Sequence, residues 1–131
     1  MNTESSATPF ELIGGEATVR ALVKRFYQLM DELPEAWEVR KLHPESLAGS
    51  EEKLYFYLTG WLGGPQLYVE RFGHPRLRGR HMPFPVDTRV RDQWLMCMRQ
   101  SLAENVTDPA MRDKLYQQMA DLADFMRNRE G

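Results

Sequence analysis

The clearest pattern in the chain is the spacing of hydrophobic residues between Glu16 and Leu33, where they recur every three or four positions. The stripe consists of Val19, Leu22, Val23, Phe26, Leu29, Met30 and Leu33. This spacing predicts an amphipathic helix with one face in the core. Tyr27 lies beside the stripe, so its ring can reach the interior with the hydroxyl leading.

Shorter helices are predicted on both sides of this one. Residues 8–11 have the composition of a capping box, with Thr8 as cap and proline at the first helical position. Gly14-Gly15 ends this segment and lets the backbone turn. After the long helix, Pro34 restarts the chain into a short helix that ends near Leu42.

The next long helix is predicted to begin at Gly49-Ser50, with the serine hydroxyl as its cap, and to end at Gly63-Gly64-Pro65. Its hydrophobic residues cover a wide arc: Leu54, Phe56, Tyr57, Leu58, Trp61 and Leu62. A helix that is hydrophobic on more than one side is usually buried between others. A short helix should follow and end near Phe72.

Two more long helices complete the predicted fold. Asp87 should cap a helix from Thr88 to about Asn105, and Asp108-Pro109 should open the last one. No segment alternates with a period of two, so no strand is predicted. The expected fold class is all-α, in a single domain over residues 1–131 with residues 1–7 disordered.

Composition narrows the class of protein. The 17 basic residues are balanced by 19 acidic ones, which argues against nucleic acid as a partner. No apolar run reaches the roughly 20 residues that span a bilayer, and the N-terminus lacks the charged-then-apolar order of a signal peptide. The single cysteine fits a reducing compartment. We therefore expect a cytoplasmic domain that does not bind a membrane.

His81 is the strongest candidate for chemistry, because it alone of the three histidines is not directly followed by proline. The prolines at 83 and 85 prevent a continuing helix, so His81 lies where a short helix ends and can point a ring nitrogen inward. Its partner could be a carbonyl, a water, a carboxylate or a metal. His74 is about 10 Å away on any helix, so the two histidines cannot share one small metal ion.

Aromatic residues with polar tips add a second signal. Tyr27 and Trp94 lie on helices with hydrophobic stripes, and the ordinary explanation is that both are core residues bonded to backbone carbonyls. Together with His81 they also provide the parts of a haem pocket, namely an axial imidazole, an apolar slot and hydrogen-bond donors.

Four arginines, Arg71, Arg76, Arg78 and Arg80, surround His81 in the sequence. A solvated basic turn explains them without any ligand. If haem is bound, arginine is suited to hold its two carboxylates in bidentate fashion, and Arg80 or Arg78 would do so.

Several segments together match one family. They are Phe26-Tyr27, Leu62-Gly63-Gly64-Pro65, Tyr68, the run from Gly73 to Pro85, and Trp94-Leu95-Met96-Cys97-Met98. In these segments, and over about Phe10 to Phe125, the chain resembles the truncated haemoglobins of group II. The resemblance implies a two-over-two helical sandwich, the truncated form of the globin fold, binding haem b.

The resemblance also implies roles for individual residues. His81 would be the proximal iron ligand, and Tyr27 and Trp94 would donate hydrogen bonds to bound O2. Leu54 would form an apolar wall of the distal pocket. Ser50 matches the place where conventional globins carry a distal histidine. Residues expected to pack the porphyrin faces and edges are Phe56, Tyr68, Leu77, Phe84 and Met98.

The chain departs from the family on the distal side. His43 stands where members often carry tyrosine or phenylalanine, and the stretch from Leu33 to Leu42 is longer than in some members. A second hypothesis follows, in which His43 or Tyr27 is a sixth iron ligand in the unliganded protein, because imidazole and phenolate both bind ferric iron.

Three classes of function fit these observations. The resemblance favours reversible binding of O2 and of other diatomic ligands such as CO and NO. The alternative is a haem enzyme with peroxidase-like or nitric-oxide-detoxifying activity in the same pocket. The third class, a helical interaction domain without cofactor, predicts a colourless protein. Expected partners are diatomic gases and an unidentified reductase, with a homodimer left open.

Overall fold

Local sequence signals set most of the helix boundaries in the computed structural model, which describes residues 7–129. The expectation of disorder for residues 1–6 lies outside this described part. The elements are α1 (Pro9–Leu12), α2 (Gly15–Glu32), a 3-10 turn η1 (Pro34–Ala36), α3 (Trp37–Arg40), α4 (Ala48–Trp61), α5 (Leu67–Phe72), α6 (Leu77–His81), α7 (Thr88–Asn105) and α8 (Pro109–Phe125). Residues 7–129 contain no strand, which confirms the all-α prediction.

Side-chain caps begin three helices as predicted. At α1 the Thr8 hydroxyl accepts from the Glu11 amide at 3.2 Å, and the Glu11 carboxylate accepts from the Thr8 amide at 3.0 Å. At α7 the carboxylate of Asp87 accepts from the Val90 amide at 2.9 Å. At α8 the carboxylate of Asp108 accepts from the Ala110 amide at 3.1 Å. Each bond satisfies a backbone donor that a helix start leaves unpaired.

The predicted serine cap of α4 is wrong. The helix begins at Ala48, two residues before Ser50, and its N-cap Leu47 makes no side-chain capping bond. Ser46 instead accepts from the Ala48 amide at 3.3 Å. Leu47 packs partly buried against the core, so tertiary packing fixes this helix start and Ser50 lies inside the first turn.

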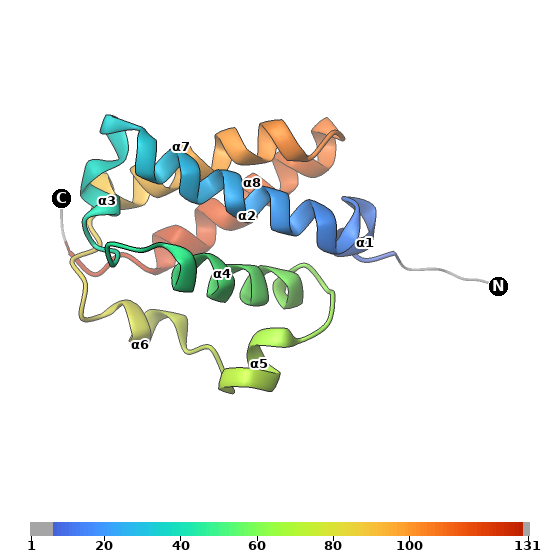
Figure 1. Ribbon diagram of the computed structural model, residues 1–131, viewed down its shortest axis with the longest axis horizontal. Helices are drawn as coiled ribbons and strands as arrows, with labels where there is room; N and C mark the ends of the chain where they lie inside the picture. Colours follow the sequence, from blue (N-terminus) through green and yellow to red (C-terminus); the bar gives the residue numbers. More distant parts are fainter. Residues whose placement is uncertain (1–6, 130–131) are drawn as a thin grey trace.

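Four long helices form two layers. Figure 1 shows α2 and α4 running in opposite directions, and α7 and α8 doing the same. The most extensive helix packing joins α2 to α7, and α2 also packs on α4 while α7 packs on α8. This arrangement confirms the two-over-two sandwich. None of the helices in the described residues combines the length and apolar composition needed to cross a bilayer.

The centre of the core lies where α2 crosses α7. Phe26 on α2 and Met98 and Leu102 on α7 are fully buried there. The hydroxyl of Ser101, also buried, donates to the Leu22 carbonyl across the interface at 2.5 Å. Cys97 is buried too, and burial raises the pKa of its thiol to about 11, so it packs as a small hydrophobic side chain.

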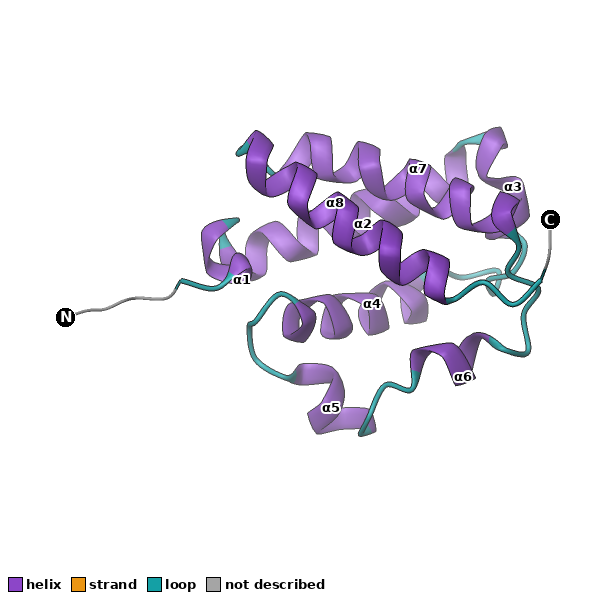
Figure 2. Cartoon of the chain, turned by 180° about the vertical axis from the view of Figure 1, so that it is seen from behind, coloured by secondary structure: helices purple, strands orange, loops and turns teal. Residues whose placement is uncertain are grey.

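The short helix α6 differs from the others. α5 packs on α4, whereas α6 makes no extensive contact with another helix within residues 7–129. Figure 2 shows α6 in the segment that crosses between α5 and the start of α7. Hydrogen bonds from flanking segments therefore matter more for the position of α6 than helix packing does.

The glycine pair after α4 allows α1 to lie against the end of that helix. Gly63 has a positive φ of 96°, and a Cβ there would lie 2.8 Å from the Thr8 Cβ. A Cβ on Gly64 would lie 2.8 Å from the ring of Phe10. The Phe10 amide donates to the Leu62 carbonyl at 2.9 Å, so the two segments are in direct contact.

We expect Gly63→Ala to lower the free energy of unfolding by about 1–3 kcal/mol, because the left-handed backbone and the close contact with Thr8 both oppose a side chain. Urea unfolding followed by circular dichroism measures this. Gly49→Ala is the matched control, since Gly49 is helical and a Cβ there meets nothing within 4 Å. Equal stability of the two variants would contradict the prediction.

Candidate functional site

Aromatic rings from both layers meet around Phe26. The ring of Phe26 contacts the ring of Tyr27 edge-on, with centroids 4.9 Å apart, and the indole of Trp94 in the same way at 5.0 Å. The ring of Tyr27 in turn meets the imidazole of His43 at 5.9 Å. The fold therefore brings Tyr27, Trp94 and His43, which are far apart in sequence, into one cluster.

The polar tips of Tyr27 and Trp94 have no protein partner among the described residues. Tyr27 is only 7% exposed, and within residues 7–129 neither its hydroxyl nor the indole N–H of Trp94 makes a hydrogen bond to the protein. Burial, with a smaller contribution from the negative charge of Glu51, raises the pKa of the Tyr27 phenol. The phenol thus keeps its proton and remains a donor. An unpaired buried donor of this kind requires an explanation.

His43 lies in the segment between α3 and α4 and is half-buried. Its Nδ1 lies 2.9 Å from the Val39 carbonyl, which can only accept, so Nδ1 carries the proton. Burial lowers the pKa of His43, the bond to Val39 opposes this, and the positive charge of Arg40 lowers it further. The ring is therefore neutral near pH 7, with a lone pair on Nε2.

Two predicted distal residues lie on the first turns of α4. Ser50 and Leu54 are one helical turn apart and both are half-buried. Leu54 packs against the edge of the core. Glu51, between them, is close enough to affect the pKa of Tyr27. This end of α4 therefore faces the cluster formed by Tyr27 and His43.

His81 ends α6 and is oriented by its own helix. Its Nδ1 lies 2.7 Å from the Leu77 carbonyl, one turn earlier, so Nδ1 donates and a neutral ring has its lone pair on Nε2. Histidines that bind metals commonly donate their other ring nitrogen to such an acceptor. No group of three or more His, Cys, Asp or Glu side chains in the described residues could hold a metal ion together.

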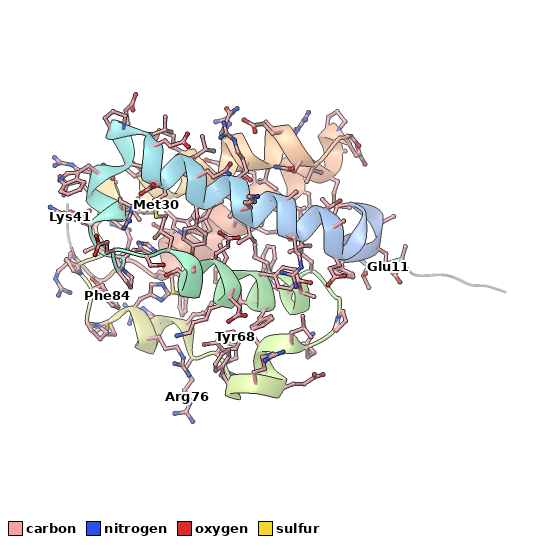
Figure 3. All side chains as sticks on the ribbon, viewed as in Figure 1. Glu11, Met30, Lys41, Tyr68, Arg76 and Phe84 are labelled. Carbon is pink, nitrogen blue, oxygen red and sulfur yellow. The ribbon has the colours of Figure 1, made fainter. Side chains whose placement is uncertain are left out.

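The arginines around His81 have different partners. Arg78 donates from Nε to the Phe125 carbonyl at 3.1 Å, at the end of α8. Arg80 donates from Nε to the Pro75 carbonyl at 2.6 Å. The guanidinium of Arg71 lies 4.6 Å above the ring of Phe56. Figure 3 shows Arg76 at the outer edge of the molecule. None of the four forms an ion pair within residues 7–129.

The remaining predicted packing residues lie in different environments. Phe56 and Tyr68 belong to an aromatic group between α4 and α5, where the ring of Phe72 meets Tyr68 at 4.9 Å and Phe56 at 6.5 Å. Met98 is fully buried in the core. Phe84, which lies in the loop after α6 (Figure 3), is 43% exposed. The structure therefore places only some of the residues that were predicted to pack the porphyrin in the cluster around Phe26.

Comparison with known proteins gives consistent matches over the whole chain. The profile of the family described as bacterial-like globin matches residues 8–128. Group 2 truncated hemoglobin YjbI of Bacillus subtilis is 34% identical over 125 residues, which are 95% of this chain and 92% of that protein.

Solved structures agree with the sequence match. The Group II 2-on-2 hemoglobin of Agrobacterium tumefaciens has a TM-score of 0.94 and 47% identity, over 99% of this chain and 100% of that one. The cold-adapted truncated hemoglobin of Pseudoalteromonas haloplanktis has a TM-score of 0.92 and 42% identity, over 94% and 99%. The chain belongs to the group II truncated haemoglobins. Membership supports haem-based binding of diatomic gases.

The geometry of this globin fits a haem. The imidazole of His81 has a fixed tautomer with Nε2 available, on a helix that no other helix packs against extensively. The Tyr27 hydroxyl and the Trp94 indole are donors with no protein acceptor in the described residues. An imidazole with a free ring nitrogen and donors without a protein partner are the kinds of group that a haem site uses.

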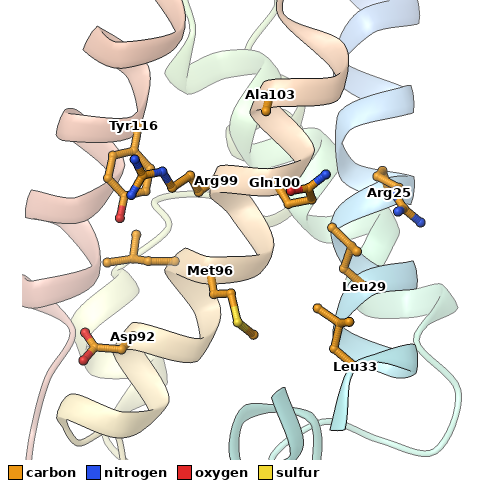
Figure 4. Close-up of a pocket in the computed structure, with 10 residues that line it drawn as sticks. Arg25, Leu29, Leu33, Asp92, Met96, Arg99, Gln100, Ala103 and Tyr116 are labelled. Carbon is orange, nitrogen blue, oxygen red and sulfur yellow. The ribbon is translucent and has the colours of Figure 1, made fainter. Parts of the chain in front are cut away.

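A separate groove lies on another face of the globin. It has a volume of about 640 Å³ and runs between α2, α7 and α8, with Arg25, Leu33, Met96, Arg99 and Tyr116 among its lining residues. Figure 4 shows these side chains on the three helices. None of the predicted haem-site residues lines it, so this groove is distinct from the cluster around Phe26.

Two contacts at the candidate site could not be predicted from the sequence. Phe26 is expected in the core and in the Phe26-Tyr27 segment of the family resemblance, but no sequence feature predicts its contact with Trp94. Asn128 donates from Nδ2 to the His81 carbonyl at 3.1 Å, a contact between residues 47 apart in sequence. No periodicity or motif marks such a long-range polar contact, whereas the bond from His81 to Leu77 follows helical spacing.

We expect the His43 imidazole to titrate with a midpoint below 6.5, because burial is the largest influence on its pKa. Since the unfolded chain then binds more protons below that pH, His43 should make the protein less stable as the pH falls. Histidine NMR signals recorded against pH, assigned by their loss in His43→Gln, measure the midpoint. A midpoint at or above 6.5 would show that burial does not control this ring.

Proposed function

We propose that this truncated haemoglobin reversibly binds O2, and also CO and NO, at a haem b held by Nε2 of His81. The observation that carries the proposal is a pair of donors, the Tyr27 hydroxyl and the Trp94 indole, which have no protein acceptor within residues 7–129 and whose rings both contact Phe26. Donors left unpaired in a pocket are suited to a ligand that enters it.

The proximal residues would hold the cofactor. The bond from His81 Nδ1 to the Leu77 carbonyl keeps the ring in one tautomer and raises the basicity of Nε2. Arg80 uses Nε to bind Pro75, which leaves its terminal nitrogens for a haem carboxylate. Arg78 is less suited to this role, because besides the Nε bond to the Phe125 carbonyl one of its terminal nitrogens donates to the Arg127 carbonyl at 3.5 Å.

The distal residues would select and retain the gas. When bound, haem supplies an iron that takes up a diatomic ligand and shifts negative charge onto it. Tyr27 would donate its O–H toward that charge, and Trp94 its N–H. Each donor would be worth about 1.5–3 kcal/mol, which corresponds to roughly ten- to hundredfold slower escape of the ligand. Leu54 and Ser50, both on α4, would form one wall of the pocket.

The proposed enzymatic alternative would use the same side chains. Peroxide or nitric oxide turnover adds a requirement for electrons from a reductase, and steady-state turnover with an added reductant distinguishes it from simple gas binding. His43, with its neutral ring beside Tyr27, is the side chain in this cluster that could bind as a sixth ligand through Nε2.

We expect His81→Ala to abolish stable haem binding, because it removes the proposed iron ligand. Absorption spectra after reconstitution with haem b and gel filtration measure retention. His74→Ala is the matched control, since His74 is exposed and lies in the loop before α6. Retention of haem with an unchanged spectrum in His81→Ala would refute the assignment of the proximal ligand.

We expect Trp94→Phe to speed O2 dissociation at least tenfold, because the variant keeps an aromatic ring beside Phe26 but loses the N–H donor. Stopped-flow displacement of O2 measures the rate. Trp37→Phe serves as control, because Trp37 is 60% exposed on α3. An unchanged rate in Trp94→Phe would remove Trp94 from ligand stabilisation and leave Tyr27 as the only proposed donor.

A further inference from the structure

The loop after α6 has few backbone donors of its own, and one of them, the Phe84 amide, donates to the His81 carbonyl at 3.0 Å. Pro83 and Pro85 have no N–H, so this loop cannot form a regular hydrogen-bond ladder. Asn128 supplies the missing partners with its side-chain amide. Its Nδ2 donates to the His81 carbonyl at 3.1 Å and to the Phe84 carbonyl at 2.9 Å, while its Oδ1 accepts from the Val86 amide at 2.9 Å.

The backbone continues the same contact. The amides of Asn128 and Arg129 both donate to the Val86 carbonyl, at 2.9 and 3.2 Å. Loop residues 81–86 and residues 128–129 are therefore joined through side chain and main chain together. An asparagine amide with both its donor and its acceptor in use on one loop holds that loop in a single conformation.

The segment that carries Asn128 is itself anchored. Arg127 donates from Nε to the Asp124 carboxylate at 2.9 Å and from a terminal nitrogen to the Thr88 hydroxyl at 3.3 Å. These bonds connect the end of α8 to the start of α7. The backbone segment that carries Asn128 is thus attached to both α7 and α8.

The start of α6 is attached to the same place. Arg78 donates to the Phe125 carbonyl at 3.1 Å, and its guanidinium lies 5.8 Å from the centre of the Phe125 ring. Since α6 has no extensive packing against another helix in the described residues, these bonds at its two ends are its main attachment to the layer of α7 and α8.

We propose that Asn128 is a positioning residue for His81. Its side-chain bonds to the His81 carbonyl, the Phe84 carbonyl and the Val86 amide determine the position of the imidazole. The inference rests on the proposed function, in which His81 holds the haem iron. Removing the amide leaves the Phe84 carbonyl and the Val86 N–H without their partners, reduces the His81 carbonyl to its bond from the Phe84 amide, and allows α6 to shift. The ring of His81 would then meet the haem in a distribution of orientations and release it faster.

The test uses the full chain loaded with haem b. Asn128→Ala removes all three side-chain bonds, and Asn128→Asp keeps an acceptor for Val86 but removes both donors. Asn105→Ala is the matched control, because Asn105 is also half-buried but donates only to the Ser101 carbonyl one turn earlier on α7. Three quantities are measured: the rate of haem transfer to excess apomyoglobin, the iron–imidazole stretching band by resonance Raman, and hydrogen exchange of the Phe84 and Val86 amides.

We expect both Asn128 variants to lose haem about tenfold faster than the wild type and to shift or broaden the iron–imidazole band, with faster exchange of the loop amides. Asn105→Ala should stay within about twofold of the wild type. The band is the decisive reading, because a general loss of stability would not change the bond between the imidazole and the iron.

Two outcomes would overturn the inference. In one, the loop amides exchange faster in Asn128→Ala while the haem transfer rate and the band stay those of the wild type, so the loop is held but His81 is not positioned. In the other, none of the three quantities changes. Failure of the proposed function is recognised separately, because haem would then remain bound in His81→Ala.

Discussion

The close crossing of α2 and α7 at Phe26 is the constraint on which both the fold and the distal site depend. The Phe26 ring is fully buried between the two helices and touches Trp94 edge-on at 5.0 Å. One turn away, the Ser101 hydroxyl bonds to the Leu22 carbonyl across the same crossing. Because Tyr27 follows Phe26 in the chain, the contact that joins the two layers also fixes the distance between the two proposed donors.

The two sides of the site are held by different kinds of interaction. Tyr27 and Trp94 stand on 18-residue helices packed in the core, so their positions share the stability of the whole domain. His81 stands on a five-residue helix held by hydrogen bonds from the chain end. Segments with few buried apolar contacts open at lower free energy than the core does. We therefore expect the proposed proximal side of this globin to open at lower free energy than the core.

The sequence was most informative where the physical cause is local. The caps at Thr8, Asp87 and Asp108 follow from residues within one turn, and all three are present. The proposed cap at Ser50 failed because the start of α4 is set by Leu47 packing against the core. Asn128 could not be found, since its partners lie more than 40 residues away and exposed polar residues surround it in sequence.

Burial shifts the pKa values of Tyr27 and His43 in opposite directions, and in both cases the neutral form of the ring is favoured. It raises the pKa of the phenol and lowers the pKa of the imidazole, because in each case the charged form loses hydration. Both rings are therefore neutral near pH 7, one as a donor and the other with a free lone pair. With no net charge on either ring, the cluster acts on a ligand through oriented dipoles, whose effect depends on how much charge the ligand itself carries. In the proposed function, ligands that become polarised when bound would thus be favoured over those that stay apolar.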